Sequence, residues 1–354
     1  MDKKIKITSL GLGFTYAGSF FGAGYVSGKE LYEFFSSFGI KGYYGIILSM
    51  FLFFVLGVFL VRTVQLSKRD SFDEVIILAD NKPLRALLAG ATVFMMFGIF
   101  VIMSAGAGAL LNQVFDLPHY VGCIVFTLSA CIVSLSGISG TVKFFSSIVP
   151  VLVICTIFIC IVALKKYGFN SELPITNTNP LLNNWWFSAI TYVSYNMITL
   201  IGTIIPVGAN IQRKRTVYGG ILFGCFIALS LAFGILLAVA SVYGSSKAEL
   251  PMLNIAMRLG NITGYIYAIL LIIAMFGTSL SSIVAIIVYF ENKIPKCNKH
   301  KKIIIFIIGI ITFLCSLSGF GNLVNTLYPI FGYIGFAVLA LIIGNFIYLK
   351  INKS

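Results

Sequence analysis

The sequence predicts an all-α integral membrane protein with about ten transmembrane helices. Hydrophobic residues make up 59% of the 354 residues and charged residues only 10%, and the mean hydropathy is +1.00. A soluble globular domain does not have this composition. A helix needs roughly 20 apolar residues to cross a hydrocarbon core of about 30 Å. Runs of that length occur near residues 8–28, 42–65, 85–111, 119–138, 143–164, 184–210, 217–242, 262–290, 302–319 and 324–349.

The basic residues predict the orientation of the chain. If the N-terminus is cytoplasmic, 19 of the 25 Lys and Arg residues fall in segments on the cytoplasmic side. Cytoplasmic loops hold such an excess, so we expect a multi-pass protein with both termini in the cytoplasm and the lipid bilayer around it. The net charge of +14 is spread over alternate loops without interleaved aromatic residues. We therefore expect no nucleic acid among its partners.

The first span contains an unusual stretch, GSFFGAGYVSGKE, at residues 18–30. One interpretation is close helix packing, because Gly18 and Gly22 form a small-xxx-small pattern that SAGAGA (104–109) would match. The other is a helix that breaks at residues 22–24 and frees backbone groups to hold a ligand or an ion. We favour the break. It would place the charges that follow, from Lys29 onward, toward the outer mouth of the protein.

The sixth span carries polar residues in its middle. AITYVSYNMITLIGTIIPVGANI (189–211) places Tyr195, Asn196 and Thr199 at its centre, followed by Gly202, Pro206 and Gly208. An unpaired Asn facing lipid would cost a few kcal/mol, so Asn196 is expected to face the interior. Transporters built from inverted repeats have two interrupted helices in equivalent positions, and we expect a second break here. The alternative is an Asn that hydrogen-bonds between helices.

Residues for catalysis are sparse in this sequence. The two histidines, His119 and His300, lie near membrane edges and far apart in sequence, and no Ser/His arrangement or pair of intramembrane carboxylates appears. The seven cysteines are scattered, with no CxxC pair. We therefore expect that the protein is not an enzyme.

The stretch ELPMLNIAMRLG (249–260) has helical apolar spacing and predicts an outer helix over the bundle.

The residues near the two expected breaks indicate the kind of solute. No Arg or Lys lies mid-span there, so a substrate carboxylate would be held by N–H groups at half-helix ends. The aromatic and aliphatic residues Phe20, Phe21, Tyr195 and Ile198 suit a small neutral zwitterion or amphipathic compound.

Three stretches resemble a known family. GFTYAGSFFGAGYVSGKELYEFF (13–35), GISGTVKFFSSIVPVL (137–152) and GTSLSSIVA (277–285) are similar to the YkvI-like membrane proteins of Gram-positive bacteria. This group belongs to the amino acid–polyamine–organocation superfamily, which has the LeuT-type fold. The resemblance covers the chain from the first span to the tenth. It implies one transmembrane domain, 1–354, in the bacterial cell membrane, with a 5+5 inverted repeat of approximately 8–165 and 184–349 and broken helices one and six.

The resemblance also implies a substrate site at the junction of the first and sixth spans. Residues 22–24 match the unwound stretch of the family, Tyr195 matches an aromatic lid, and Ser104 lies at a depth that suits the opposite wall. The implied substrate-binding residues are Phe20, Gly22, Ala23, Gly24, Ser104, Tyr195, Asn196, Ile198 and Thr199.

A coupling ion is implied less directly. Sodium-coupled relatives hold Na⁺ between carbonyls of span one and hydroxyls of span eight, as a hard cation prefers oxygen ligands. The corresponding residues are Ala17, Gly18, Phe20, Gly277, Thr278 and Ser281. Leu280 stands where relatives have a threonine. Some proton-coupled relatives replace the Na⁺ with a lysine on span five, where Lys143 is the candidate. A positive-inside anchor is the plain alternative for Lys143.

Together these observations predict a secondary active transporter of a small neutral solute, such as an amino acid or related zwitterion, working by alternating access. No cofactor other than Na⁺ is expected. A small-molecule sensor resembling germinant-receptor subunits stays open as an alternative, as does a proton-coupled carrier or uniporter of an amine or nucleobase. The sequence leaves the oligomeric state open.

Overall fold

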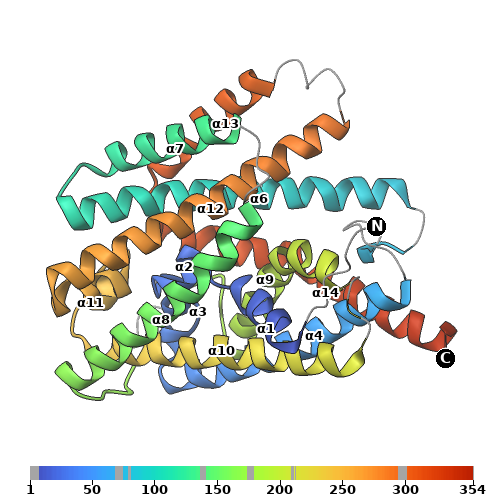
Figure 1. The fold of residues 1–354 in the computed structure, drawn as a ribbon, viewed down its shortest axis with the longest axis horizontal. Coiled ribbons are helices and arrows are strands. Elements are labelled where there is room, and N and C mark those ends of the chain that lie inside the picture. The colour runs from blue at the N-terminus through green and yellow to red at the C-terminus, as the bar shows by residue number, and fades with distance from the viewer. Residues whose placement is uncertain are drawn as a thin grey trace.

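The computed structural model describes residues 8–67, 75–78, 81–135, 141–173, 179–208, 211, 213–293 and 301–353, and every regular element in these ranges is a helix. Figure 1 shows their arrangement. The helices are α1 (Ser9–Gly18), α2 (Ala23–Val26), α3 (Lys29–Phe35), η1 (Ser36–Phe38), α4 (Ile40–Ser67), α6 (Lys82–Phe115), α7 (His119–Leu135), α8 (Thr141–Tyr167), α9 (Trp185–Gly208), α10 (Lys214–Ser241), η2 (Ser245–Lys247), α11 (Pro251–Leu259), α12 (Asn261–Lys293), α13 (Lys301–Ser316) and α14 (Phe320–Lys353).

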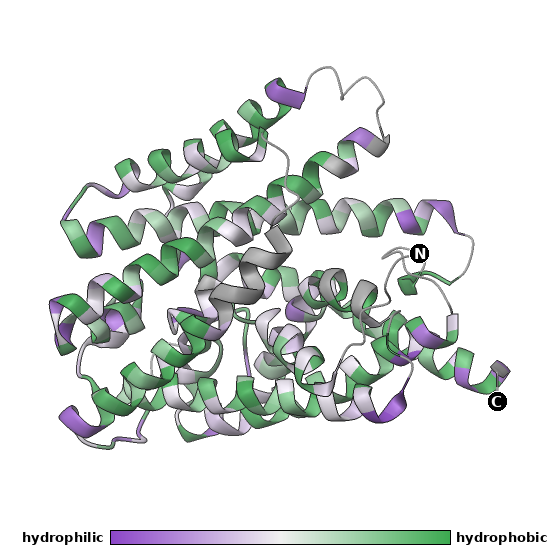
Figure 2. Ribbon diagram, viewed as in Figure 1, coloured by the Kyte–Doolittle hydropathy of each residue, from purple (hydrophilic) through white to green (hydrophobic). Residues whose placement is uncertain are grey.

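The long helices are apolar along most of their length. In the described part of the chain, six helical stretches, within α4, α6, α8, α10, α12 and α14, are long and apolar enough to cross a membrane, and α7 is a shorter apolar helix. Figure 2 shows hydrophobic residues along these helices and hydrophilic residues gathered toward their ends. The protein is therefore a multi-pass membrane protein in its composition and helix lengths. The count of ten spans stays a prediction.

The predicted break in the first span is confirmed. Helix α1 ends at Gly18 and α2 begins at Ala23. The end of α1 thus comes about one turn before the break expected at residues 22–24. Between them the backbone makes short-range hydrogen bonds, such as Phe21 N–H to Gly18 O at 3.3 Å and Gly22 N–H to Phe20 O at 2.8 Å. A second interruption separates α2 from α3 at Gly28, whose φ of +81° favours glycine. The first span is thus three short helical pieces.

The predicted break in the sixth span is wrong. Helix α9 runs without interruption from Trp185 to Gly208. The polar residues that indicated a break bond back to the helix that carries them: Asn196 Nδ2 donates to Tyr192 O at 3.0 Å, and Thr199 Oγ1 donates to Asn196 O at 2.8 Å. Side chains that bond to their own backbone let polar residues remain in a continuous helix.

The helices pack as two groups. In the first group, α1 and α4 each contact both α9 and α10, and in the second group α6, α7, α12 and α13 all contact one another. Figure 1 shows α7 and α13 above α6 and α12, with α4 and α10 on the opposite side. Helix α8 contacts α10 and α12, and α14 contacts α4, α6 and α9, so these two helices join the groups. The broken first span lies where the groups meet.

Close packing by small residues occurs beside the break and not at it. A Cβ on Gly13 would lie 2.9 Å from Gly220 O, so α1 and α10 approach too closely for a larger residue. The SAGAGA stretch of α6 does not pack on Gly18 and Gly22 as the packing interpretation required. Its glycines instead face Met275 and Phe320 (Gly106) and α7 (Gly108).

Candidate functional site

A cavity of about 120 Å³ lies at the break in the first span. Both helix groups contribute to its wall, together with α3 and α14. The lining residues are Gly18, Ser19, Phe20, Phe21, Gly22, Glu30, Ile99, Met103, Tyr195, Asn196, Thr199, Ile273, Ala274, Thr278 and Tyr328. A small apolar chamber with a few polar groups is typical of a small-molecule site.

Glu30 is the acidic residue of this cavity. Its side chain is only 4% exposed, and it accepts a hydrogen bond at Oε1 from the hydroxyl of Tyr195. The carboxylate lies over Gly24, because a Cβ built on Gly24 would come within 2.7 Å of Glu30 Oε2. The expectation that this charge marks the outer mouth is therefore wrong for Glu30. The turn at Gly28 sets the direction of α3, so that Glu30 faces inward.

Aromatic rings form one side of the cavity. Tyr195 and Tyr328 stack with ring centroids 4.8 Å apart and an interplanar angle of 13°. Phe20 packs on Phe53, with the two ring centroids 4.4 Å apart. Tyr328 comes from α14, directly before Pro329. Neither Tyr328 nor Glu30 is among the predicted substrate-binding residues. Glu30 follows the predicted first span, 8–28, by two residues, and an acidic residue so close to a span is the sequence signal that indicates a function for it.

Several hydroxyl and amide donors around the cavity have acceptors in the protein. Ser19 Oγ donates to Thr15 O at 2.9 Å, and Thr278 Oγ1 donates to Ala274 O at 3.0 Å. The Asn196 amide and the Thr199 hydroxyl donate within α9, as described above, and Tyr195 donates to Glu30. What these groups still present to the cavity is mainly oxygen lone pairs.

The structure brings five of the nine predicted substrate residues to the cavity, namely Phe20, Gly22, Tyr195, Asn196 and Thr199. Gly24 lies beneath Glu30 and Tyr328, outside the lining. Ser104 is on the face of α6 that meets α7, where its Oγ bonds Thr127 Oγ1 at 2.6 Å. Ile198 is buried in α9 away from the cavity. The side chain of Ala23 lies outside the described residues.

The structure brings some of the predicted sodium ligands to the cavity and leaves others outside it. Gly18, Phe20 and Thr278 line the cavity, while Ala17 and Gly277 are buried beside it. Ser281 is exposed and does not line it. The predicted hydroxyl pair therefore contributes only Thr278 to the cavity, which is a smaller oxygen set than a Na⁺ site usually offers. The side chain of Lys143 lies outside the described residues. In the described ranges no group of three or more His, Cys, Asp or Glu residues suits a metal ion.

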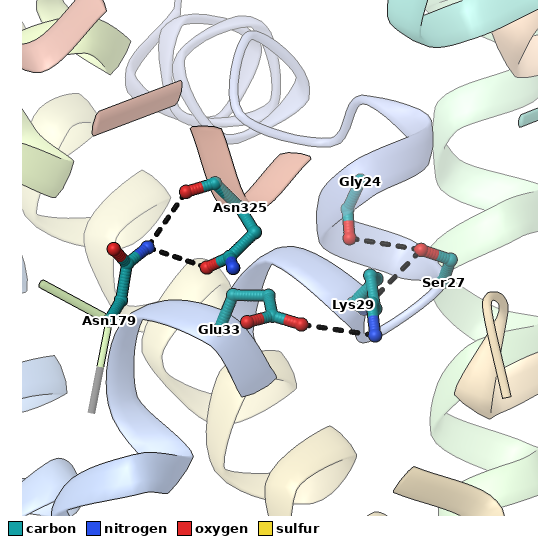
Figure 3. Close-up of polar contacts among 6 residues, drawn as sticks. All are labelled: Gly24, Ser27, Lys29, Glu33, Asn179 and Asn325. Atoms are coloured by element: carbon teal, nitrogen blue, oxygen red, sulfur yellow. Dashed lines mark hydrogen bonds and ion pairs between the residues drawn. The ribbon is translucent and has the colours of Figure 1, made fainter. Parts of the chain in front are cut away.

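Polar contacts connect the segments that flank Glu30 in the chain. Lys29 Nζ pairs with Glu33 Oε1 at 3.0 Å, and Ser27 Oγ donates to Gly24 O at 3.0 Å (Figure 3). Met252 N–H of α11 donates to Ser27 O at 2.9 Å, which fastens the predicted outer helix over the second interruption. Figure 3 also shows Asn179 bonded to Asn325 at the start of α14. These contacts join α11 to the turn between α2 and α3, and the segment before α9 to α14.

Comparison with known proteins places the fold. No protein-family model matches the chain. The chain is 27% identical over 333 residues to the uncharacterized membrane protein YkvI of Bacillus subtilis (strain 168), covering 93% of each protein.

Solved structures agree in overall architecture. MhsT in complex with L-phenylalanine matches with a TM-score of 0.64 and 19% identity, over 97% of this chain and 90% of that one. A Na⁺-coupled sialic acid symporter in a substrate-bound outward-open state matches with a TM-score of 0.62 and 15% identity, over 92% of this chain and 76% of that one. At these identities the likeness shows the fold alone, which is the LeuT type implied by the sequence resemblance.

Proposed function

We propose that the protein is a secondary transporter whose substrate site is the cavity at the break between α1 and α2. The observation that carries this proposal is the position of the cavity. Residues of the broken first span and α9 form one part of its wall, and residues of α6 and α12 form another. A solute held there touches both helix groups, so its binding energy is sensitive to how the groups are placed relative to each other.

Alternating access follows from this arrangement. Helices α1, α4, α9 and α10 would rock against α6, α7, α12 and α13, and a 5+5 inverted repeat of approximately 8–165 and 184–349 would relate the two halves. Interrupted helices that supply a mid-membrane site are the usual basis of such transport. Both termini would lie in the cytoplasm of a bacterial cell, in accordance with the distribution of Lys and Arg.

The proposed cargo is a small neutral solute such as an amino acid or related zwitterion. The small volume and the largely apolar wall support this size and character. Sodium coupling would use Thr278 and the backbone oxygens of the break, with Ser281 reaching them only after a rearrangement of α12. Proton coupling and uniport are the alternatives, and Lys143 is the residue proposed for the first.

Uptake by proteoliposomes tests the function. Purified protein is reconstituted, and radiolabelled amino acids and amines are supplied with an inward gradient of Na⁺ or of K⁺. We expect saturable uptake above that of protein-free liposomes, and above that of the Gly24→Leu variant, in which the new side chain would displace Glu30 and Tyr328. Saturable binding to detergent-purified protein without any uptake would replace the transporter with the sensor alternative.

A further inference from the structure

We propose that the Glu30 carboxylate binds a positively charged amino group of the substrate, so that the cavity selects solutes with an ammonium group. This inference rests on the proposed function for the use of the site, and it adds the chemical class that the site recognises. Three independent features of the cavity support it: its charge, its hydrogen-bonding groups and its aromatic wall.

The first feature is a buried carboxyl group with no cation beside it in the cavity. Among the described residues that line the cavity, Glu30 carries the one carboxyl group, and none is Lys, Arg or His. The neighbouring cation, Lys29, is engaged by Glu33 on the outer turn of α3. A buried carboxylate without a cation is unstable by several kcal/mol. A substrate ammonium within the cavity would supply the missing charge.

The second feature is a surplus of acceptors. One donor of each of five lining side chains is directed to a protein oxygen; these residues are Ser19, Tyr195, Asn196, Thr199 and Thr278. The oxygen lone pairs of these side chains are therefore open to donors of a ligand, beside the second N–H of Asn196 and the hydroxyl of Tyr328. A primary ammonium has three N–H donors and no acceptor, which complements such a wall.

The third feature is the aromatic surface next to the carboxylate. Tyr195 and Tyr328 stack on each other beside Glu30, and Phe20 and Phe21 line the break. Ring faces attract organic cations by cation–π interaction. A bare Na⁺ requires a shell of oxygen ligands, which these rings would not provide. An organic ammonium satisfies the carboxylate and the rings at once.

Matched ligands test the inference by the thermal stability of the purified protein. Each set holds an amino acid, the amine that lacks its carboxylate and the acid that lacks its amino group. The sets are valine, isobutylamine and isovalerate; leucine, isoamylamine and isocaproate; and phenylalanine, phenethylamine and 3-phenylpropanoate. A ligand that binds only the folded state raises Tm with concentration. We expect the ammonium-bearing members of at least one set to stabilise the wild type, and the acids to leave Tm unchanged.

Two variants locate the effect. Glu30→Gln removes the charge at constant shape and should raise the Kd of the ammonium-bearing ligand by about 10- to 100-fold, the loss expected for a hydrogen bond to a charged group. Glu172→Gln is the same substitution at an exposed glutamate outside the cavity, and should leave that Kd within about twofold. If Glu30→Gln does not fold, the comparison between amines and acids on the wild type decides the question alone.

The contrary outcomes are distinct. Stabilisation by the acids, no shift from any ammonium-bearing ligand, or an unchanged Kd in folded Glu30→Gln would each overturn the inference. So would a Glu30→Gln variant that binds the amine normally but loses uptake, because the carboxylate would then carry a proton and not the substrate. Binding of amines that requires Glu30 without uptake into proteoliposomes would sustain the inference while refuting transport.

Discussion

Tyr195 donates its hydroxyl hydrogen to Glu30 Oε1, joining α9 to α3 across 165 residues of sequence at the wall of the cavity. The ring of Tyr195 also stacks on Tyr328 of α14. One tyrosine thus connects the acidic group, the aromatic wall and two helices from opposite halves of the chain. A change in any of these partners should be detected in solute binding.

The hydroxyl of Tyr195 is expected to contribute to ligand binding, separately from the stacking of its ring. In Tyr195→Phe the stacked ring remains, but Glu30 loses the hydrogen bond from the Tyr195 hydroxyl, and we expect the Kd of an ammonium-bearing ligand to rise about tenfold. Tyr267→Phe is the control, since Tyr267 is an equally buried tyrosine whose hydroxyl donates to Val26 O at 2.7 Å away from the cavity. It should lower Tm with little change in Kd. Equal Kd values for the two variants would contradict the role given to Tyr195.

Two glycines of the first span should respond differently to the same substitution. A Cβ on Gly24 would lie 2.7 Å from Glu30 Oε2 and 3.2 Å from Tyr328, whereas a Cβ on Gly22 would meet nothing within 4 Å. Gly24→Ala should therefore weaken binding strongly and cost about 1–3 kcal/mol of stability, while Gly22→Ala should change stability by less than about 0.5 kcal/mol. Melting curves with and without ligand measure both the stability and the binding of each variant. If the two variants had the same stability and the same affinity, the glycines would have a packing role only.

Asn196 should act in binding and not mainly in folding. Its amide donates one N–H to Tyr192 O within its own helix, and the residue also lines the cavity. We therefore expect Asn196→Ala to reduce ligand affinity more than it reduces Tm. Asn345 offers the opposite case, because its amide ties α14 to Val75 O and Ile76 O at 3.1 and 2.7 Å. Asn345→Ala should lower Tm and spare affinity. The reverse pattern would make Asn196 structural.

The Lys29–Glu33 pair should contribute modestly to the stability of α3. The side chains are 11% and 19% exposed, and a partly solvated pair of this spacing is worth about 0.5–1 kcal/mol. A double-mutant cycle with Lys29→Met and Glu33→Gln, followed by thermal unfolding, measures the coupling. Strictly additive effects would show that the pair does not stabilise α3.

Much of the fold was predictable from residue patterns, while the content of the site was less so. Run lengths located the helices, and the glycines of residues 18–28 identified a break in the first span. The side of α3 that Glu30 occupies depends on the turn at Gly28, and a residue pattern does not fix the direction in which a chain leaves such a turn. The break expected in α9 is absent. The polar groups of Asn196 and Thr199 can bond either to a ligand at a break or to the backbone of their own helix, and the sequence does not reveal which of the two occurs.

Residues from distant elements were the hardest to predict. Tyr328 reaches the cavity only because α14 packs between the two helix groups, a tertiary contact that no local pattern encodes. Ser104 has the right depth but the wrong rotation, since a helix turns by about 100° for each residue. The exposed Ser281 differs from the prediction for the same reason.

A cysteine at residue 22 tests the central claim, that a solute binds at the break in the first span, most directly. The Gly22→Cys side chain would project into space at the cavity wall. In a variant that lacks the seven native cysteines, the rate of alkylation by a small thiol reagent is measured with and without the ammonium-bearing ligand that raises Tm. We predict that saturating ligand slows alkylation several-fold, while the matching acid does not. An unchanged rate at saturating ligand would place the solute elsewhere and contradict the account.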